Sequence, residues 1–431
     1  MTSSKFMKLK KYKVHLSIFL IIILLISNLF FIYVFNSKYN FSINNNKLSI
    51  TKKSLDNIKS FVYTSYYDFK LEYIPTQRFD KYGGIEIINN DLFHIFSNGE
   101  VAIHKQNEFQ FLKINPVENY KSDFIRKYDN TDAFISGFGV RDTFYDNDKS
   151  SLFISSLEYD NDNDCYFISV FYIKINVKNL NYNYDKSWKK ILSTEPCLKT
   201  NSTEIIFQAQ SAGGRIQKLD DNYLLSVGDF NFHEGGSNIN IYDDDNSDYS
   251  KIILFDLNGN KRHFSFGHRN PQGLVVFNSD SEKIIIETEH GPEGGDEVNL
   301  IRDLSHYGYP YNSYGTNYGE KIWSAKKNDY GYSFEDPILS LTPALGISEL
   351  IFWNNDNIEK WKNDILISSL RAKAIYRLKL DKNYKPFFIE KIALNKRIRD
   401  LNYDDDGNIF ILSDSLSETE SPTIIKMSLI K

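Results

Sequence analysis

The chain has 431 residues, of which 15% are aromatic and 25% charged, and its formal net charge is −5. This length accommodates one large β domain or two to three ordinary domains. Abundant Phe and Tyr with only three Met favour the half-buried surfaces of β-sheets. The acidic balance argues against a nucleic-acid partner, because a nucleic-acid surface requires a basic patch.

The first 36 residues differ in character from the rest. Five lysines precede an apolar stretch from Leu16 to Phe35. About 20 apolar residues span a hydrocarbon core of about 30 Å, whereas a cleaved signal peptide has a shorter apolar core and a small-residue cleavage site. We predict a cytoplasmic basic tail over residues 1–13 and a single transmembrane signal anchor over 14–36, with a cleaved signal as the alternative. The lysines place the remaining chain on the periplasmic or extracytoplasmic side of the membrane.

Beyond the anchor, residues 37–60 are polar and rich in Asn, Ser and Lys, which predicts a tether between the membrane and a folded domain. The part of the chain after residue 36 has 46 basic and 56 acidic residues, a net charge of about −10. This charge is compatible with a small neutral substrate.

Two cysteines, Cys165 and Cys197, lie in the predicted exported part. Each flanks an apolar run that is typical of a β-strand. Outside the cytoplasm such a pair can oxidise, so a disulfide is one interpretation. Two separate half-buried thiols are the other, and neither cysteine has the spacing of a metal or redox motif.

From residue 61 to the C-terminus a loose unit recurs: a short apolar strand, an Asp/Asn/Gly turn, a second apolar strand and a polar loop. These turn residues are the ones that a strand reversal needs. Clear examples cover residues 85–96, 214–229, 273–289, 350–370 and 397–415. Repeated hairpins with little helical periodicity predict an all-β β-propeller over residues 61–431. On pattern alone, a β-sandwich or several β domains remain alternatives.

The segment Gly267–Gly315 concentrates polar side chains among glycines and prolines. It contains G-H-R-N-P-Q-G-L, E-H-G-P-E-G-G-D-E-V-N-L-I and Y-G-Y-P-Y-N-S-Y-G. Together with R-I-R-D at Arg397–Asp400, it closely resembles the glucose/sorbosone dehydrogenase family. The resemblance extends from about Gly213 to the C-terminus and implies a six-bladed propeller, a pyrroloquinoline quinone (PQQ) cofactor, calcium and an aldose sugar substrate.

The resemblance also implies roles for individual residues. Asp229 and Arg269 would lie at the catalytic centre, and the carbonyls of Gly291 and Pro292 would bind calcium. Glu297 would serve a structural metal or only its loop. The residues expected to contact the cofactor are Arg269, Asn270, His290, Asp296, Arg371, Arg397 and Arg399. Arginine suits this task because its planar fork binds carboxylates at two points, and calcium prefers oxygen ligands.

Each of these residues also has an ordinary structural interpretation. Arg397 and Arg399 alternate along a predicted strand, where exposed arginines are common. Asp296 and Glu297 could cap a loop, and His290 could be an ordinary loop histidine.

The chain departs from the family where a catalytic histidine is expected. That histidine precedes G-G-R by two residues, and here the position is Ser211. A hydroxyl is far too weak a base near neutral pH, whereas imidazole titrates close to it. General-base assistance contributes about 10²–10⁴-fold to such a rate. His233, Glu234 or Asp229 could replace the base.

The sugar-facing wall departs as well, because residues 341–348 lack the aromatic residue and the A-P-S turn of the family. The sequence therefore supports two functions. One is a membrane-anchored quinoprotein sugar dehydrogenase that passes electrons to an acceptor. The other is a catalytically impaired relative that binds PQQ and calcium, or a sugar. A hub that has lost its ligand is a third, weaker alternative.

Overall fold

A computed structural model describes residues 39–44, 47–52, 60–76, 83–105, 108–120, 123, 138–178, 181–199, 211–231, 241–279, 282–316, 333–414 and 422–430. The chain divides into two compact units, Met1–Lys59 and Ser60–Lys431. In the first unit β1 (Tyr39–Asn44) and β2 (Lys47–Lys52) pair as an antiparallel hairpin. This hairpin falls within the segment predicted as a tether. Among the described residues, no helix has the length and hydropathy needed to cross a membrane, and the predicted anchor at 14–36 lies outside them.

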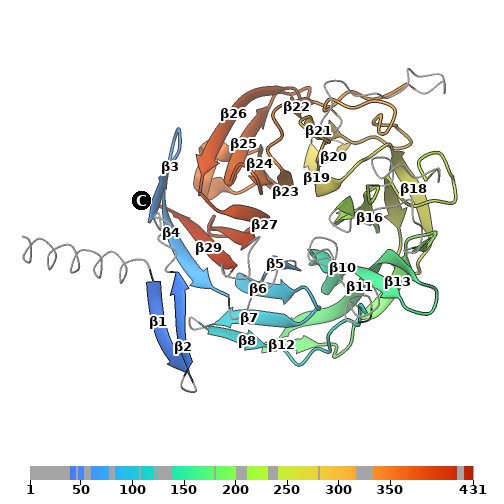
Figure 1. The fold of residues 1–431 in the computed structure, drawn as a ribbon. Coiled ribbons are helices and arrows are strands. Elements are labelled where there is room, and N and C mark those ends of the chain that lie inside the picture. The colour runs from blue at the N-terminus through green and yellow to red at the C-terminus, as the bar shows by residue number, and fades with distance from the viewer. Residues whose placement is uncertain are drawn as a thin grey trace, which may run out of the picture. The chain divides into compact units, whose positions relative to one another are not determined.

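The second unit is a ring of six β-sheets around a central axis (Figure 1). Each sheet is a blade, and in the first, third, fourth and fifth blades four strands follow one another in sequence as a meander of antiparallel hairpins. The all-β six-bladed propeller predicted from the sequence is confirmed.

The first three blades are built as follows. The first contains β5 (Gly83–Ile88), β6 (Asp91–Phe96), β7 (Val101–Lys105) and β8 (Glu108–Phe111). The second contains β9 (Gly139–Asp146), β10 (Ser151–Asp160), β11 (Cys165–Lys178) and β12 (Asn181–Tyr184), with β13 (Lys189–Ser193) and β14 (Leu198–Lys199) also paired to β11. The third contains β15 (Gly213–Leu219), β16 (Asn222–Val227), β17 (Lys251–Phe255) and β18 (Lys261–Phe266).

The last three blades complete the ring. The fourth contains β19 (Pro271–Ser279), β20 (Glu282–Glu289), β21 (Asp296–Leu300) and β22 (Leu339–Leu341). The fifth contains β23 (Ile347–Trp353), β24 (Asp364–Ser369), β25 (Ala374–Leu380) and β26 (Pro386–Ala393), and a 3₁₀ helix η2 (Asp356–Trp361) joins its first two strands. The sixth contains β27 (Arg397–Tyr403), β28 (Ile409–Asp414), β29 (Thr423–Leu429), β4 (Asp68–Pro75) and β3 (Phe61–Tyr63).

The sixth blade closes the ring because it combines both ends of the propeller chain. C-terminal β29 pairs antiparallel with β4 from the start of the domain, and Ile425 lies opposite Tyr73. Separate hydrophobic cores fill the spaces between blades. The second strands β16, β24 and β28 have a buried residue at nearly every position, because both of their faces are covered by neighbouring blades.

The disulfide between Cys165 and Cys197 is present, with the two Cα atoms 5.5 Å apart. Cys165 begins β11 and pairs with Lys199 of the short strand β14, so the bond fixes the outer edge of the second blade. The interpretation as two separate thiols is therefore wrong.

Candidate functional site

The residues singled out from the sequence gather where the inner strands begin. Arg269 immediately precedes β19, and its backbone N–H donates to Glu289 Oε2 at 2.7 Å. Its Nη1 donates to the carbonyls of His290 and Gly291, at 3.1 and 2.8 Å. Arg269 thus joins the start of β19 to the loop that follows β20, and its side chain is almost fully buried.

Asp296 organises the neighbouring loop before β23. Its Oδ2 accepts from the backbone N–H groups of Leu345, Gly346 and Ile347 at 2.8, 2.7 and 3.3 Å. Its Oδ1 accepts from Gly291 N at 3.3 Å. A buried carboxylate with several N–H donors is well satisfied without a cation. Asp296 therefore positions this site by fixing two loops against each other.

His290 lies between these loops and the sixth blade. Its Nε2 contacts the carbonyl of Ile347, and its backbone N–H donates to Asn270 O at 3.1 Å. Burial lowers the pKa of His290, the charge of Asp296 opposes this shift, and Arg269 and Arg399 add to it. Arg399 and Arg269 therefore act on the same imidazole, although 130 residues separate them in sequence.

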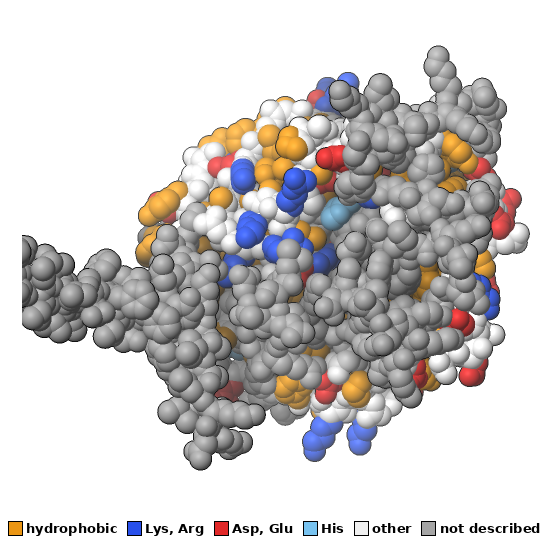
Figure 2. All heavy atoms as spheres, viewed as in Figure 1, with side chains coloured by type: hydrophobic (Ala, Val, Ile, Leu, Met, Phe, Trp, Pro, Cys, Tyr) orange, Lys and Arg blue, Asp and Glu red, His pale blue; other side chains and the backbone are white. Residues whose placement is uncertain are grey.

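The arginines of R-I-R-D lie on β27 and share one carboxylate. Arg399 Nη2 is 2.5 Å from Asp414 Oδ2, and Arg397 Nη2 is 3.4 Å from the same oxygen. Asp414 lies opposite Arg397 in the register of β27 and β28. Two guanidinium groups thus approach one carboxylate oxygen. Figure 2 shows Lys and Arg side chains gathered beside a His side chain near the middle of one face.

The remaining predicted cofactor contacts lie close by in different environments. Arg371 is exposed, and its Cβ lies 3.1 Å from where a Cβ on Gly346 would be. Its side chain forms no ion pair with a described residue. Asn270 is buried, and its Oδ1 accepts from Gln272 Nε2 at 2.7 Å. That amide is therefore already engaged within its own loop.

Ser211 and Asp229 lie on the third-blade side of the same region. The Asp229 N–H donates to Arg269 O at 2.8 Å, and Ser211 O accepts from Phe230 N at 3.2 Å. The Asp229 carboxylate is fully buried and accepts from Asn231 N and from the Tyr242 hydroxyl, at 2.9 and 3.2 Å. Asp229 is thus adjacent to the site, but its carboxylate already accepts hydrogen bonds from Asn231 and Tyr242. His233 and Glu234, the other candidate bases, lie outside the described residues.

A small pocket of about 10 Å³ borders the predicted metal ligands Gly291, Pro292 and Glu297. A volume of this size holds about one water molecule or ion. Burial raises the pKa of Glu297 to about 7, so this carboxylate would gain from a cation. The Gly291 carbonyl, however, accepts from Arg269, and this hydrogen bond would have to open before the carbonyl could bind calcium.

Arg215, on β15, was not predicted from the sequence as part of a site. Its buried guanidinium pairs with Asp142 of β9 at 2.7 Å and with Glu349 of β23, and it donates to the carbonyls of Gln272 and Arg399. Side chains and carbonyls of five blades therefore meet at one arginine on the axis.

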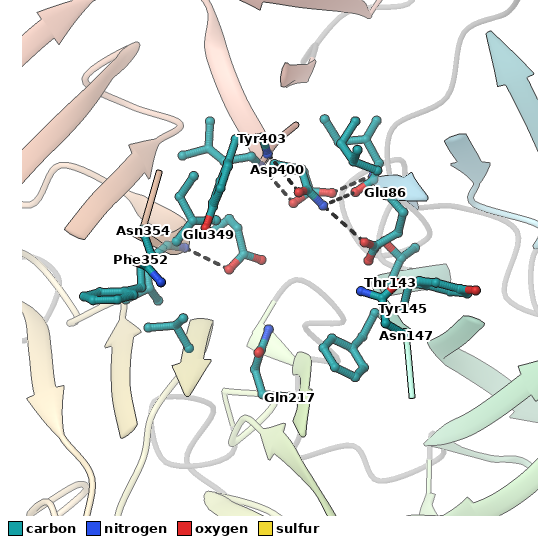
Figure 3. A pocket seen from close by; sticks show the side chains of 18 of the residues that line it. Glu86, Thr143, Tyr145, Asn147, Gln217, Glu349, Phe352, Asn354, Asp400 and Tyr403 are labelled. Atoms are coloured by element: carbon teal, nitrogen blue, oxygen red, sulfur yellow. Dashed lines mark hydrogen bonds between the residues drawn. The ribbon is translucent and has the colours of Figure 1, made fainter. Parts of the chain in front are cut away.

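A large cavity among the described residues lies at the other ends of the inner strands. It measures about 650 Å³ and is lined by the later residues of these strands and the turns after them, among them Asn147, Asn278, Asn354 and Tyr403. Figure 3 shows Glu86, Asp400 and Glu349 on one side of this opening and Gln217 on the other. None of the predicted cofactor residues lines it. The large cavity is therefore a separate place from the region formed by Arg269, His290, Asp296, Arg397 and Arg399 (the arginine-rich region).

Comparisons with known proteins identify the family. The sequence model of the "Glucose / Sorbosone dehydrogenase" family matches residues 199–421. Aldose sugar dehydrogenase YliI of Escherichia coli is 32% identical over 157 residues, covering 36% of this chain and 41% of that protein. Quinoprotein glucose dehydrogenase B of Acinetobacter calcoaceticus is 26% identical over 219 residues, covering 38% and 45%. The aligned stretches thus span less than half of each relative.

Among solved structures, the apo form of the soluble aldose sugar dehydrogenase from E. coli is similar with a TM-score of 0.64 and 18% identity, over 84% of this chain and 99% of that one. This likeness establishes the fold. Since the family model covers more than half of the sequence and its motifs form the arginine-rich region, the chain belongs to the glucose/sorbosone dehydrogenase family.

Proposed function

We propose that this protein binds PQQ at the arginine-rich region and acts as a quinoprotein oxidoreductase on an aldose sugar. The observation that carries the proposal is the convergence of Arg269, His290, Asp296 and Arg399, from the fourth and sixth blades, on one place where inner strands begin. PQQ bears three carboxylates, and several guanidinium groups close together suit such an anion. When bound, this cofactor would supply the group that accepts a hydride.

The chain's own residues would hold and orient this cofactor. Arg397, Arg399 and the exposed Arg371 supply positive charge from the fifth and sixth blades. Asp296 fixes the loop at Leu345–Ile347, and Arg269 fixes the loop after β20. We place calcium at the small pocket beside Gly291, Pro292 and Glu297, with rotation of Arg269 away from the Gly291 carbonyl as a condition.

A second candidate function is cofactor binding without sugar oxidation. Ser211 occupies the expected position of the base, and Asp229 is buried against Tyr242. His290, the histidine at this site in the described structure, directs Nε2 to a backbone carbonyl. Losing general-base assistance is expected to lower turnover by about 10²–10⁴-fold while leaving cofactor binding intact.

The test is titration of the purified full-length protein with PQQ, with and without Ca²⁺, followed by absorbance and thermal unfolding. We expect saturable, calcium-dependent binding that is weakened at least about tenfold by Arg399→Gln, since one charge-assisted contact contributes about 1.5–3 kcal/mol. The matched control is Arg262→Gln, because Arg262 is an exposed arginine paired with Asp303 on the outer strand β18. Absence of any response to PQQ would refute both candidate functions.

If PQQ binds, a panel of aldoses with an artificial electron acceptor separates the two functions. Reduction of the acceptor supports the dehydrogenase, and binding without reduction supports the impaired relative.

We propose, as a further step, that residues 14–36 anchor this domain at the extracytoplasmic face of a membrane. Carbonate extraction of cell membranes tests the anchor: the protein should remain with the lipid, and release into the supernatant would refute anchoring.

A further inference from the structure

An unusual group of buried polar side chains lies between the third and fourth blades. Glu287 and Glu289 alternate on β20, and Glu297 and Asn299 alternate on β21. The strand register places Glu287 opposite Asn299 and Glu289 opposite Glu297, so all four point to one face of the sheet. Further along the same face, Ile285 and Ile301 pack into an apolar cluster with residues of the third blade. The face thus changes from apolar to acidic in a place where a propeller normally packs hydrocarbon.

His268 completes this group from the end of the third blade. It is fully buried, and its ring stacks on Tyr307 with centroids 4.9 Å apart. Its Nε2 lies 2.8 Å from Ser265 Oγ, while Nδ1 has no hydrogen-bond partner among the described residues. Ligand atoms of His268, Glu287 and Glu289 all lie within 4.8 Å of one another.

The hydrogen-bond donors around these carboxylates are too few. The Asn299 Nδ2 group approaches Glu287 Oε2, Glu289 Oε1 and Glu297 Oε2 at 3.1, 3.3 and 3.4 Å, yet an amide has only two N–H bonds. The backbone N–H groups of Arg269 and Tyr314 supply one further donor each, to Glu289 and to Glu297.

Two buried oxygens, Glu287 Oε1 and Asn299 Oδ1, have no partner among the described residues, and no described Lys or Arg side chain forms an ion pair with the three glutamates. Several buried carboxylates without a cation are strongly unfavourable.

We propose that His268, Glu287 and Glu289 form a binding site for a divalent transition cation such as Mn²⁺ or Zn²⁺. The side-chain oxygen Oδ1 of Asn299 would be a further ligand. An imidazole nitrogen beside carboxylate oxygens suits these ions, whereas Ca²⁺ prefers oxygen ligands alone. Ligands bound at about 2.1 Å are at most about 4.2 Å apart, so the present spacing requires only a small contraction. Ser265 Oγ would hold the second nitrogen of His268, as outer partners of metal-bound histidines do.

This site adjoins the proposed calcium site, because Glu289 also borders the small pocket and lies opposite Glu297, but its principal ligands are different. None of its three principal ligands is Gly291, Pro292 or Glu297, and the ion would link β20 of the fourth blade to the loop after β18 of the third. Its role would be to neutralise an acidic patch and join two blades directly behind Arg269. The inference does not depend on PQQ binding.

The test uses the full-length protein, stripped with a chelator and then equilibrated separately with Mn²⁺, Zn²⁺ or Ca²⁺ in the absence of PQQ. Metal content after gel filtration is measured by plasma mass spectrometry, and bound Mn²⁺ by electron paramagnetic resonance. We expect one Mn²⁺ or Zn²⁺ per chain, with affinity lowered at least about 100-fold in Glu287→Gln, because loss of a ligand should exceed the 10–100-fold effect of an outer partner. Glu282→Gln is the matched control, since Glu282 is exposed on the same strand.

Metal retention that is equal in Glu287→Gln and Glu282→Gln would overturn the proposal, as would retention of Ca²⁺ alone. If the Glu287 variant does not fold, Co²⁺ substitution of the wild-type protein decides the question. A visible absorption band from imidazole and carboxylate coordination supports the site, and a spectrum identical to aqueous Co²⁺ refutes it.

Discussion

Asp400 is a buried carboxylate on the inner strand β27, and it shows how the axis of the propeller responds to pH. Its Oδ2 accepts from Ile85 N at 2.7 Å and its Oδ1 from Leu401 N at 2.9 Å. Burial raises the pKa of Asp400 to about 6, the charge of Arg215 opposes this shift, and Asp142 adds to it. Between about pH 4 and pH 6 the folded protein therefore binds more protons at this residue than the unfolded chain does.

We predict that this residue's contribution to the free energy of unfolding is greatest below about pH 4 and falls by up to about 3 kcal/mol as the pH rises above about 6. Urea unfolding of the wild type and of Asp400→Asn over pH 4–7 measures it: the free energy of unfolding of the wild type should fall relative to that of the variant as the pH rises. Asp406→Asn, at an exposed aspartate in the next turn, should give a profile parallel to the wild type. Parallel profiles for Asp400→Asn would contradict the prediction.

At the residue scale, the sequence predicted the members of the site better than their partners. The motifs around Arg269, Asp296 and Arg399 indicated these residues directly, and the structure brings them together. Asp414 was missed because its link to Arg397 depends on strand register, which the isolated motif S-D-S does not encode. Arg215 stood in the motif G-G-R, but its partners come from four other blades and are unrelated to it in sequence.

At the scale of elements, the disulfide between β11 and the start of β14 is the strongest local constraint on the second blade. Closing a loop between residues 32 positions apart removes conformational entropy from the unfolded chain, with an expected stabilisation of roughly 3–4 kcal/mol. We predict that the free energy of unfolding of the double variant Cys165→Ser/Cys197→Ser is lower by this amount, so that it unfolds at a lower urea concentration. Reduction of the wild type should reproduce the loss, and a variant as stable as the oxidised wild type would contradict it.

Hairpins with strong turn residues were the elements that could be predicted. The alternation around Asp91 or Asp406 identifies two strands and their reversal from local chemistry alone. By contrast, β13 and β14 pair with β11 at its outer edge, where neither strand shows strong apolar alternation. The pairing of β4 with β29 could not be predicted from the sequence either, because it joins residues about 350 positions apart. Long-range pairing is specified by the closed ring rather than by either strand.

At the scale of the whole molecule, the ring of blades depends on contacts at its axis as well as on the apolar cores between blades. Arg215 is 4% exposed and contacts Asp142, Glu349 and two carbonyls, so it connects five of the six blades. Removing one partner from a buried ion pair leaves uncompensated charge and costs about 3–5 kcal/mol. Its partner Glu349 also lines the large cavity.

We therefore predict that Arg215→Met destabilises the propeller by about 3–5 kcal/mol, while Arg262→Met, at an exposed pair with Asp303, costs at most about 1 kcal/mol. With Trp188 and Trp323 replaced by Phe in both variants and the reference protein, tryptophan fluorescence reports on the fifth blade, since Trp353 and Trp361 are buried there. Far-ultraviolet circular dichroism reports on all six blades. If Arg215 joins the blades into one cooperative unit, the two signals should separate into distinct transitions in Arg215→Met and coincide in the wild type. Equal stability of the Arg215 and Arg262 variants would instead show that the apolar contacts between blades suffice to hold the ring together.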